Sequence, residues 1–315
     1  MWTDYLHTWQ RRAMIRAQEP FNLEAYPEQQ NRFHYPRAKL PICLHPIVIA
    51  RGEETTRFLL LQACFQFMEE IASIEENIVI DINTKLLNRI YMPYLSDSHR
   101  QVLRSISIDE YFHSMTGWNY RDQLKLLTGC DSIAFKASST QDAMAQQSQS
   151  IEDSEVKAFF EINVLCLVEN TITDSLLDYA KDKRCHDAFM DFNMSHIQDE
   201  AHHSKFYREM LITAYKNTDV NIQKEVAMLL PVFIRKSLDD HEEKCNYNYI
   251  LLKHSGFSEG EADTIISETY PDIANTYQFS TINVAAARNL ELLTQIPIYQ
   301  CSDIKENFQA HGLSL

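Results

Sequence analysis

The sequence predicts an all-α protein built around a bundle of four long helices. The 315 residues include only six glycines, too few for the tight turns and phosphate loops of a β-rich or Rossmann-type protein. Apolar residues recur every three to four positions over several long segments. The pattern Asp-Glu-x-x-His occurs twice, from Asp109 to His113 and from Asp199 to His203. Two Glu-x-x-His helices, each partnered by a helix with one more Glu, form a two-metal carboxylate site in known helical bundles.

The bulk composition excludes several function classes. A formal net charge of −15 disfavours nucleic acids and anionic membrane surfaces as partners. Cysteine occurs seven times without a Cys-x-x-Cys motif, and Cys43, Cys64 and Cys166 lie among apolar residues, as expected of small buried side chains in a reducing compartment. The N-terminus shows no basic region followed by an apolar run, so we expect a cytoplasmic protein.

The first 50 residues are predicted to pack on the bundle as an N-terminal strap. Residues 3–17 could form a short polar helix. Residues 18–50 contain five of the nine prolines, which favours an extended conformation. Residues 51–315 are expected to form a single domain.

The first half of the bundle is predicted to be a helical hairpin. One helix covers about 54–89, and its apolar stripe includes Ile71 and Ile78, with Glu75 between them on the same face. Pro93 follows the helix as a stop signal. The next helix covers about 98–127 and carries the first Glu-x-x-His motif.

The second half repeats this plan. Residues 137–150 are polar and low in complexity, which predicts a flexible crossover between the two hairpins. A helix over about 151–180 contains an apolar run that ends at Glu169, and a helix over about 186–214 carries the second motif. Later helices are predicted at about 220–240, 241–254, 259–268 and 280–294.

Spacing links the two motifs to two further glutamates. Chance alone would produce about one Glu-x-x-His in a chain of this composition, so a single copy would be weak evidence. Here each motif glutamate follows an apolar-flanked glutamate: Glu75 is 35 residues before Glu110, and Glu169 is 31 residues before Glu200. Both intervals suit a helix, a turn and a returning helix that brings the carboxylates level.

A third histidine extends the second motif. His196, Glu200 and His203 stand at i, i+4 and i+7, on one helix face, whereas His202 is one residue off that face. The candidate metal ligands are therefore Glu75, Glu110, His113, Glu169, His196, Glu200 and His203. Four carboxylates and three imidazoles suit two ions of iron, with manganese as a possible substitute, better than tetrahedral zinc.

Asp109 and Asp199 are candidates for an outer layer around these ligands. A metal-binding histidine usually donates its second ring N–H to a carboxylate. Each Asp precedes a motif glutamate and could orient the histidine on the opposite motif helix.

These residues resemble the p-aminobenzoate N-oxygenase family, a ferritin-like two-iron family with an extra histidine on its last bundle helix. The resemblance covers about residues 40–295 and implies the same seven ligands. It further implies oxidation of an amine by O2, with electrons from a reductase or other donor, as part of secondary metabolism. The segment containing Phe279-Ser280 and Ala287-Arg288 is similar to one that supplies a substrate-facing arginine, Arg288. Homodimers are common among such bundles.

Two departures from the family affect the expected substrate. Phe67 replaces a pocket tyrosine eight residues before the first ligand, and Thr173 replaces a pocket asparagine four residues after Glu169. The amine could therefore be an aryl amine, an amino acid or an aminoacyl group on a carrier protein. A desaturase or C–H hydroxylase is an alternative, which the third histidine disfavours. Iron storage is another, although the region 215–315 is long for a ferritin.

Overall fold

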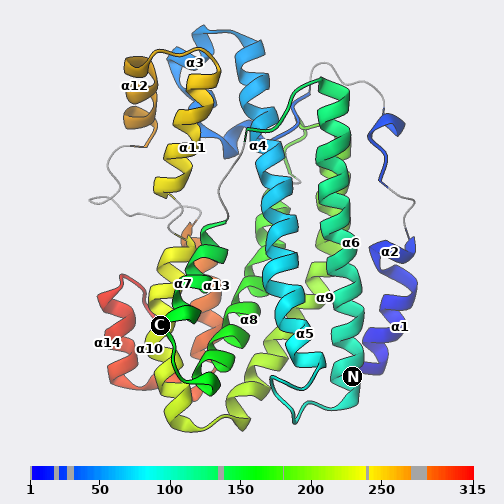
Figure 1. Cartoon of the computed structure of the whole chain (residues 1–315), viewed down its shortest axis with the longest axis vertical. Coiled ribbons are helices and arrows are strands. Elements are labelled where there is room, and N and C mark those ends of the chain that lie inside the picture. Colours follow the sequence, from blue (N-terminus) through cyan, green and yellow to red (C-terminus); the bar gives the residue numbers. More distant parts are fainter. Residues whose placement is uncertain are drawn as a thin grey trace.

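The computed structural model describes residues 2–17, 21–26, 32–133, 138–179, 181–238, 241–270 and 282–315. Within these ranges the chain is almost entirely helical; its only β-type pairing is an isolated parallel bridge between Phe33 and Cys185. The predicted all-α class is therefore confirmed (Figure 1). None of the described helices is both long and apolar enough to cross a membrane.

Four long helical segments form the central bundle (Figure 1). Their bounds agree with the expected ones to within a few residues, and both hairpins are present. The segments are α4 (Glu53–Ile74) with its continuation η4 (Glu75–Ile80) and α5 (Asp81–Leu87), α6 (Asp97–Thr128), α8 (Ser154–Tyr179) and α9 (Asp187–Asn217).

Local signals explain where α6 begins and ends. The Ser96 side chain accepts a hydrogen bond from the backbone N–H of His99, which satisfies one of the first free donors of the helix. At the other end Gly129 adopts a left-handed φ of 66°, and its N–H donates to the Lys125 carbonyl.

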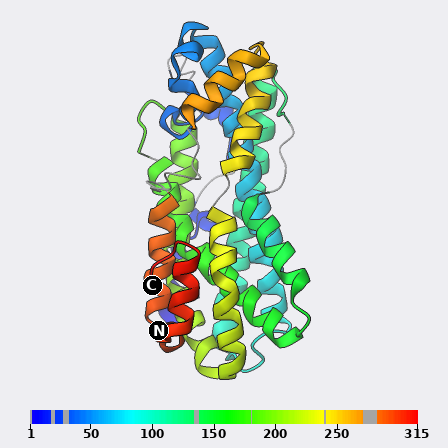
Figure 2. The same ribbon diagram turned by 90° about the vertical axis from the view of Figure 1, so that its left-hand side faces the viewer.

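Shorter elements surround the bundle. Helices α1 and α2 lie beside α6, while α3, α11 and α12 gather at one end of the molecule (Figure 1). Helices α10, α13 and α14 lie together at the opposite end (Figure 2). The bounds are α1 (Trp2–Arg12), α2 (Met14–Ala17), η1 (Leu23–Ala25), η2 (Arg37–Lys39), η3 (Pro41–Leu44), α3 (Pro46–Ala50), α7 (Ser139–Ser150), α10 (Val220–Leu238), α11 (His241–His254), α12 (Glu259–Thr269), α13 (Ile282–Thr294), η6 (Pro297–Gln300) and α14 (Ser302–Ala310).

The expected flexible crossover at 137–150 is wrong in its conformation, because residues 139–150 form helix α7. Ser138 caps the helix by accepting from the Thr140 N–H. One face, which includes Ala143 and Met144, is buried against α8 and α10, and the Gln147 amide donates to the Leu229 carbonyl at 2.8 Å. Tertiary packing therefore stabilises a helix that polar composition alone did not predict.

The N-terminal region also differs from the expectation. The helix expected over 3–17 is interrupted at Ala13 and divides into α1 and α2. The described parts of the proline-rich segment, 21–26 and 32–50, form short 3-10 turns and α3 rather than an extended strap. Prolines at the first turns of η3 and α3 begin these helices, because a missing N–H costs nothing there.

The helix expected over 54–89 contains a widened turn. The residues from Glu75 to Ile80 form a π-helical turn, flanked by α-helix on both sides. Ile78, Val79 and Ile80 in this turn are all buried. Such turns are rare and occur frequently at functional sites. This one starts at a predicted metal ligand.

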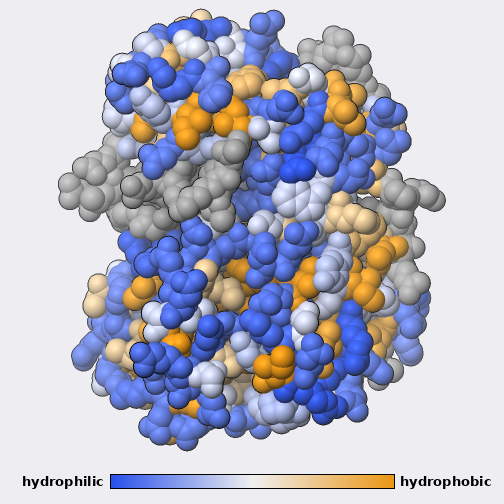
Figure 3. Space-filling model, viewed as in Figure 1, coloured by the Kyte–Doolittle hydropathy of each residue, from blue (hydrophilic) through white to orange (hydrophobic). Residues whose placement is uncertain are grey.

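Helix α8 is buried on almost every side. Its residues from Val164 to Leu167 have no exposed surface, because α7, α9, α10 and α13 pack around it. The additional C-terminal helices thus cover the most apolar helix of the bundle. The face of the molecule seen in Figure 3 is mostly hydrophilic with separate apolar patches.

Gly117 allows α6 to approach α4 closely. A Cβ atom at this position would lie 3.3 Å from the Met68 carbonyl oxygen and 3.6 Å from the Ala72 Cβ. We expect Gly117→Leu to lower the free energy of unfolding by about 1–3 kcal/mol, because the larger side chain must force the helices apart. Thermal or denaturant unfolding measures the change. Gly260→Leu is the matched control, since a Cβ there meets nothing within 4 Å, and equal losses in both variants would contradict the prediction.

Candidate metal centre

The seven side chains expected to bind metal lie together at the centre of the bundle. They come from all four long segments, and each is at most 1% exposed. Their ligand atoms form two groups, each within 4.8 Å. The first group contains Glu75, His113, His196 and Glu200, and the second contains Glu110, Glu169, Glu200 and His203. Glu200 belongs to both, so its carboxylate lies between the two candidate metal positions.

The first group is arranged around the Glu200 carboxylate. His196 Nε2 lies 2.9 Å from Glu75 Oε1 and 3.1 Å from Glu200 Oε1. His113 Nδ1 lies 3.4 Å from the same Glu200 oxygen. One turn of α9 brings His196 level with Glu200, and the start of the π-helical turn places Glu75 opposite both.

The second group is built in the same way. His203 Nδ1 lies 2.7 Å from Glu110 Oε1 and 3.4 Å from Glu200 Oε1. Glu169 enters from α8 and is 1% exposed. Each half of the chain therefore supplies a motif helix and a partner helix with one glutamate.

Several buried atoms of this cluster make no well-directed hydrogen bond to any described residue, although some of them lie close to an oxygen or nitrogen of a neighbouring cluster residue. They include both carboxylate oxygens of Glu75, one oxygen each of Glu110, Glu169 and Glu200, and Nδ1 of His113 and His203. A buried polar group without a partner is costly, and buried carboxylates also repel one another. Two bound cations would satisfy these atoms and offset the negative charge, so the residues fit a two-metal centre.

Burial and mutual charge shift the acidity of the cluster strongly. Burial raises the pKa of Glu75 to about 7, and it raises the pKa of Glu169 well above the ordinary range. For Glu200, burial opposes ionisation, but the surrounding histidines outweigh it and hold the pKa well below the usual value. The carboxylate shared by both groups is thus held in its ionised form.

The histidines show the reverse pattern. Burial favours neutral imidazole, yet the carboxylates around His113 and His203 raise the pKa of both rings well above the ordinary value. Without metal, protons on these histidines offset part of the negative charge of the carboxylates. Metal binding must release these protons.

Asp109 and Asp199 form crossed pairs with the histidines. His113 on α6 has its Nε2 3.1 Å from Asp199 Oδ2 on α9, and His203 on α9 has its Nε2 3.2 Å from Asp109 Oδ2 on α6. Each ring therefore directs Nδ1 toward the carboxylate cluster and Nε2 toward an aspartate. This arrangement fixes the tautomer and rotation of both rings.

The expected substrate residues lie outside the two groups. Phe67 is buried two turns before Glu75, among the rings of Tyr35, Tyr179 and Phe189. Arg288 on α13 is exposed, and its role in binding a substrate carboxylate stays a prediction. Thr173 lies on α8, one turn after Glu169, but its side chain falls outside the part of the chain that the structure describes.

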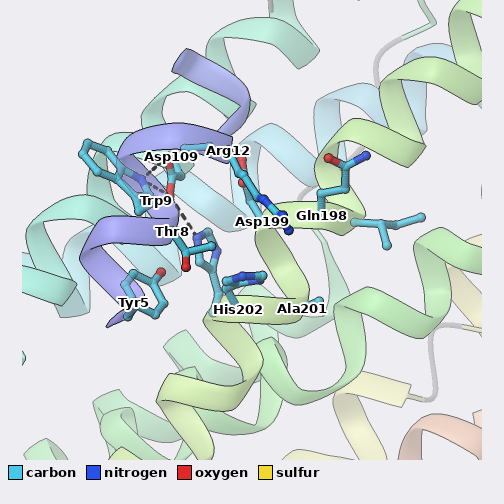
Figure 4. A pocket seen from close by; sticks show the side chains of 12 residues that line it. Tyr5, Thr8, Trp9, Arg12, Asp109, Gln198, Asp199, Ala201 and His202 are labelled. Carbon is cyan, nitrogen blue, oxygen red and sulfur yellow. Dashed lines mark hydrogen bonds and ion pairs between the residues drawn. The ribbon is translucent and has the colours of Figure 1, made fainter. Parts of the chain in front are cut away.

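Two features near the centre had no recognisable sequence signal. The Trp9 indole donates to Asp109 from α1, as the close view in Figure 4 shows. The Asn170 amide, one residue after Glu169, donates to Asn289 Oδ1 at 3.1 Å and connects α8 to α13. Both pairs join residues at least 100 positions apart, so no local sequence pattern predicts them.

Fold and site together define a class: a ferritin-like helical bundle whose centre is suited to binding metal ions. The chain belongs to the p-aminobenzoate N-oxygenase (AurF) family, whose model matches residues 4–244. No curated protein matches the sequence. The family is one of oxygenases, which supports an enzyme.

The crossed aspartates give a prediction for metal affinity. We expect Asp199→Asn and Asp109→Asn each to weaken metal binding by about 10–100-fold, because the amide no longer accepts the ring N–H as a charged partner. Titration of the metal-free protein with Fe(II) under anaerobic conditions measures this. Asp191→Asn is the control, since its side chain on α9 is exposed and bonds Tyr26 instead. Unchanged affinity in both centre variants would contradict the assigned role.

Proposed function

We propose that the protein is a two-iron N-oxygenase that uses O2 to oxidise an amine to a hydroxylamine, with nitroso and nitro compounds as possible further products. The observation that carries the proposal is the pair of buried four-residue groups joined by Glu200, in a chain that belongs to an N-oxygenase family. Mixed carboxylate and imidazole donors suit iron, and manganese could substitute.

In this proposal the seven candidate residues are the ligands of the two ions. Glu75, His113 and His196 would hold one ion, and Glu110, Glu169 and His203 would hold the other, with Glu200 shared. When bound, the iron pair supplies reductive activation of O2 and transfer of one oxygen atom to the amine nitrogen. The overall reaction consumes the amine, O2, two electrons and two protons, and it yields hydroxylamine and water. A reductase or another electron donor must supply the electrons.

The chain's own contribution is geometry and exclusion of water. All candidate ligands are nearly inaccessible to solvent, and the aspartates hold two of the three imidazoles in one orientation. A dry, rigid site lets charged groups interact strongly and protects reactive species from side reactions.

In this proposal a ring-bearing substrate would lie toward the aromatic cluster around Phe67. Phe67 and Phe189 stand two turns before Glu75 and His196 on their respective helices, and their ring centroids are 5.6 Å apart. The Tyr35 hydroxyl donates to the Tyr179 hydroxyl at 3.1 Å at the same place. An aryl amine that extends from the metals toward this cluster would meet aromatic edges and two phenol groups. An amino acid or a carrier-bound aminoacyl group remains an alternative substrate, because Phe67 replaces the tyrosine of the aminobenzoate enzymes.

The test combines metal analysis with product analysis. We expect the Fe(II)-loaded protein to contain about two iron ions per chain and, with reductant and O2, to convert at least one aryl amine to an N-oxygenated product detectable by mass spectrometry. A product oxidised only on carbon would instead support a hydroxylase or desaturase. A mineral load of many iron ions per chain would support storage, and absence of bound metal would refute the proposal.

A further inference from the structure

The N-terminal arm, residues 2–17 comprising α1 and α2, makes a polar contact with each of the aspartates behind the metal centre. Trp9 Nε1 donates to Asp109 at 2.8 and 2.7 Å, one distance for each carboxylate oxygen. The backbone N–H of Met14 donates to Asp199 Oδ2 at 3.1 Å. Figure 4 shows the Trp9 indole directed at Asp109 between α1 and the motif helices.

With these contacts, two series of hydrogen bonds of the same form, here called relays, connect the arm to the metal centre. One leads from Trp9 through Asp109 to His203, and the other leads from the Met14 N–H through Asp199 to the ring of His113. The two histidines belong to different metal groups. A single segment of the chain therefore reaches both groups, each through one carboxylate.

Burial makes the arm's donors important. Asp109 is 1% exposed and Asp199 is 7% exposed, so each depends on protein donors rather than on water. The hollow of about 400 Å³ between α1 and α9 includes both aspartates and His203 in its lining. An arm that moves away would open this side to water and would leave both carboxylates free to rotate.

We propose that the N-terminal arm is a positioning element of the metal centre: Trp9 and the Met14 N–H fix Asp109 and Asp199, and these fix His203 and His113. The proposal rests on the metal centre proposed above. Because coupling between two binding events is reciprocal, metal binding must stabilise the docked arm by the same factor by which the docked arm tightens metal binding.

The first test is Trp9→Phe in the full chain, which keeps an aromatic ring and removes the donor. We expect Fe(II) affinity to fall about tenfold and the visible absorption bands of the Co(II)-loaded protein to shift. Trp118→Phe is the matched control: Trp118 Nε1 also donates to a carboxylate, Glu76 Oε1 at 2.9 Å, but exposed Glu76 belongs to neither metal group. We expect this control to bind metal like the wild type.

A double mutant separates positioning from general loss of structure. If Trp9 acts through Asp109, Trp9→Phe should change affinity by less than about twofold in the Asp109→Ala background. An undiminished loss in that background would overturn the proposal, as would wild-type affinity in Trp9→Phe itself.

The second relay has its own variant pair. Met14 is the first residue of α2, where proline suits the helix geometry; Met14→Pro removes the backbone N–H together with the methionine side chain. Met14→Ala loses the same side-chain packing but keeps the donor. We expect Met14→Pro to bind metal about tenfold more weakly than Met14→Ala, and equal affinities would remove Met14 from the proposal.

Because metal binding and arm docking stabilise each other, proteolysis of the arm tests the proposal without an activity measurement. Arg11 and Arg12 are exposed at the end of α1, so trypsin reports how often the arm undocks. We expect metal loading to slow cleavage there in the wild type by about tenfold and much less in Trp9→Phe. Identical cleavage rates with and without metal would overturn the positioning role. A wild type that binds no metal would instead refute the metal centre itself, so the two failures are distinguishable.

Discussion

Replacement of Glu200 by alanine should remove both metal ions at once. Its carboxylate is the one shared by the two groups, and its Oε1 lies within 3.4 Å of a ring nitrogen of each of the three histidines. We expect metal content to fall from about two ions per chain to nearly none and amine oxidation to fall by at least about a thousandfold, a barrier increase of roughly 4 kcal/mol. Elemental analysis of the purified variant and product quantification measure the two effects.

Two further variants test whether both ions are lost because Glu200 belongs to both groups. His196 belongs to one group only, so His196→Ala should lose one ion preferentially and keep the other. His202 is exposed next to His203 and belongs to neither group, so His202→Ala should retain both. Equal metal loss in all three variants would show that Glu200 has no special position.

The sequence predicted the bundle and the closeness of the seven candidate ligands because both depend on periodicity. Glu at i and His at i+3 share a helix face wherever the helix forms, and the intervals before each motif match a helical hairpin. The crossed pairs of Asp109 with His203 and Asp199 with His113 join α6 to α9. They were expected because a metal-binding histidine usually donates its second ring N–H to a carboxylate. The helix-face and spacing rules are local, so they need no knowledge of tertiary structure.

Features that depend on tertiary contacts were not predictable in this way. The residues from Glu75 to Ile80 suit an α-helix as well as a π-helical turn, and nothing in their identity selects the wider form. Helix α7 is stabilised by packing against α8 and α10, which outweighs its polar composition. The contact between Trp9 and Asp109 joins residues 100 positions apart, so neither residue's surroundings in the sequence indicate it.

Removal of the metal ions should destabilise the whole domain. If metal is present at about a thousand times its dissociation constant, its loss costs about 4 kcal/mol, which corresponds to a fall of roughly 10 °C in melting temperature. Chelation followed by differential scanning calorimetry measures the change, and readdition of Fe(II) without O2 should restore it. A melting temperature that is independent of chelator would contradict a structural contribution of the ions.

The effect of chelation should also depend on pH, with a defined sign. Burial raises the pKa of Glu75 from 4.5 to about 7 in the folded metal-free protein, and the pKa values of His113 and His203 lie well above their ordinary 6.5. For all three groups the folded state binds protons more tightly than the unfolded state. The contribution of these three groups to the free energy of unfolding of the metal-free protein is therefore fully present at low pH. This contribution is lost as pH rises through the folded pKa values. Metal-loaded protein should not show this loss near neutral pH, because cations have replaced the protons.

Glu169→Gln should lower the stability of the metal-loaded protein but not that of the metal-free protein. Burial and the nearby carboxylates raise the pKa of Glu169 well above its usual range, so the metal-free protein holds it in the neutral acid form. Glutamine has the same shape and cannot ionise, so the metal-free variant should be as stable as the wild type or more so by about 1 kcal/mol, especially above neutral pH. In the presence of metal the amide is a poor ligand, and the variant should melt below the wild type. If Glu169 had only a structural role, Glu169→Gln should lower the melting temperature both with and without metal. If Glu169 is a metal ligand that is neutral in the metal-free protein, the melting temperature should fall only when metal is present.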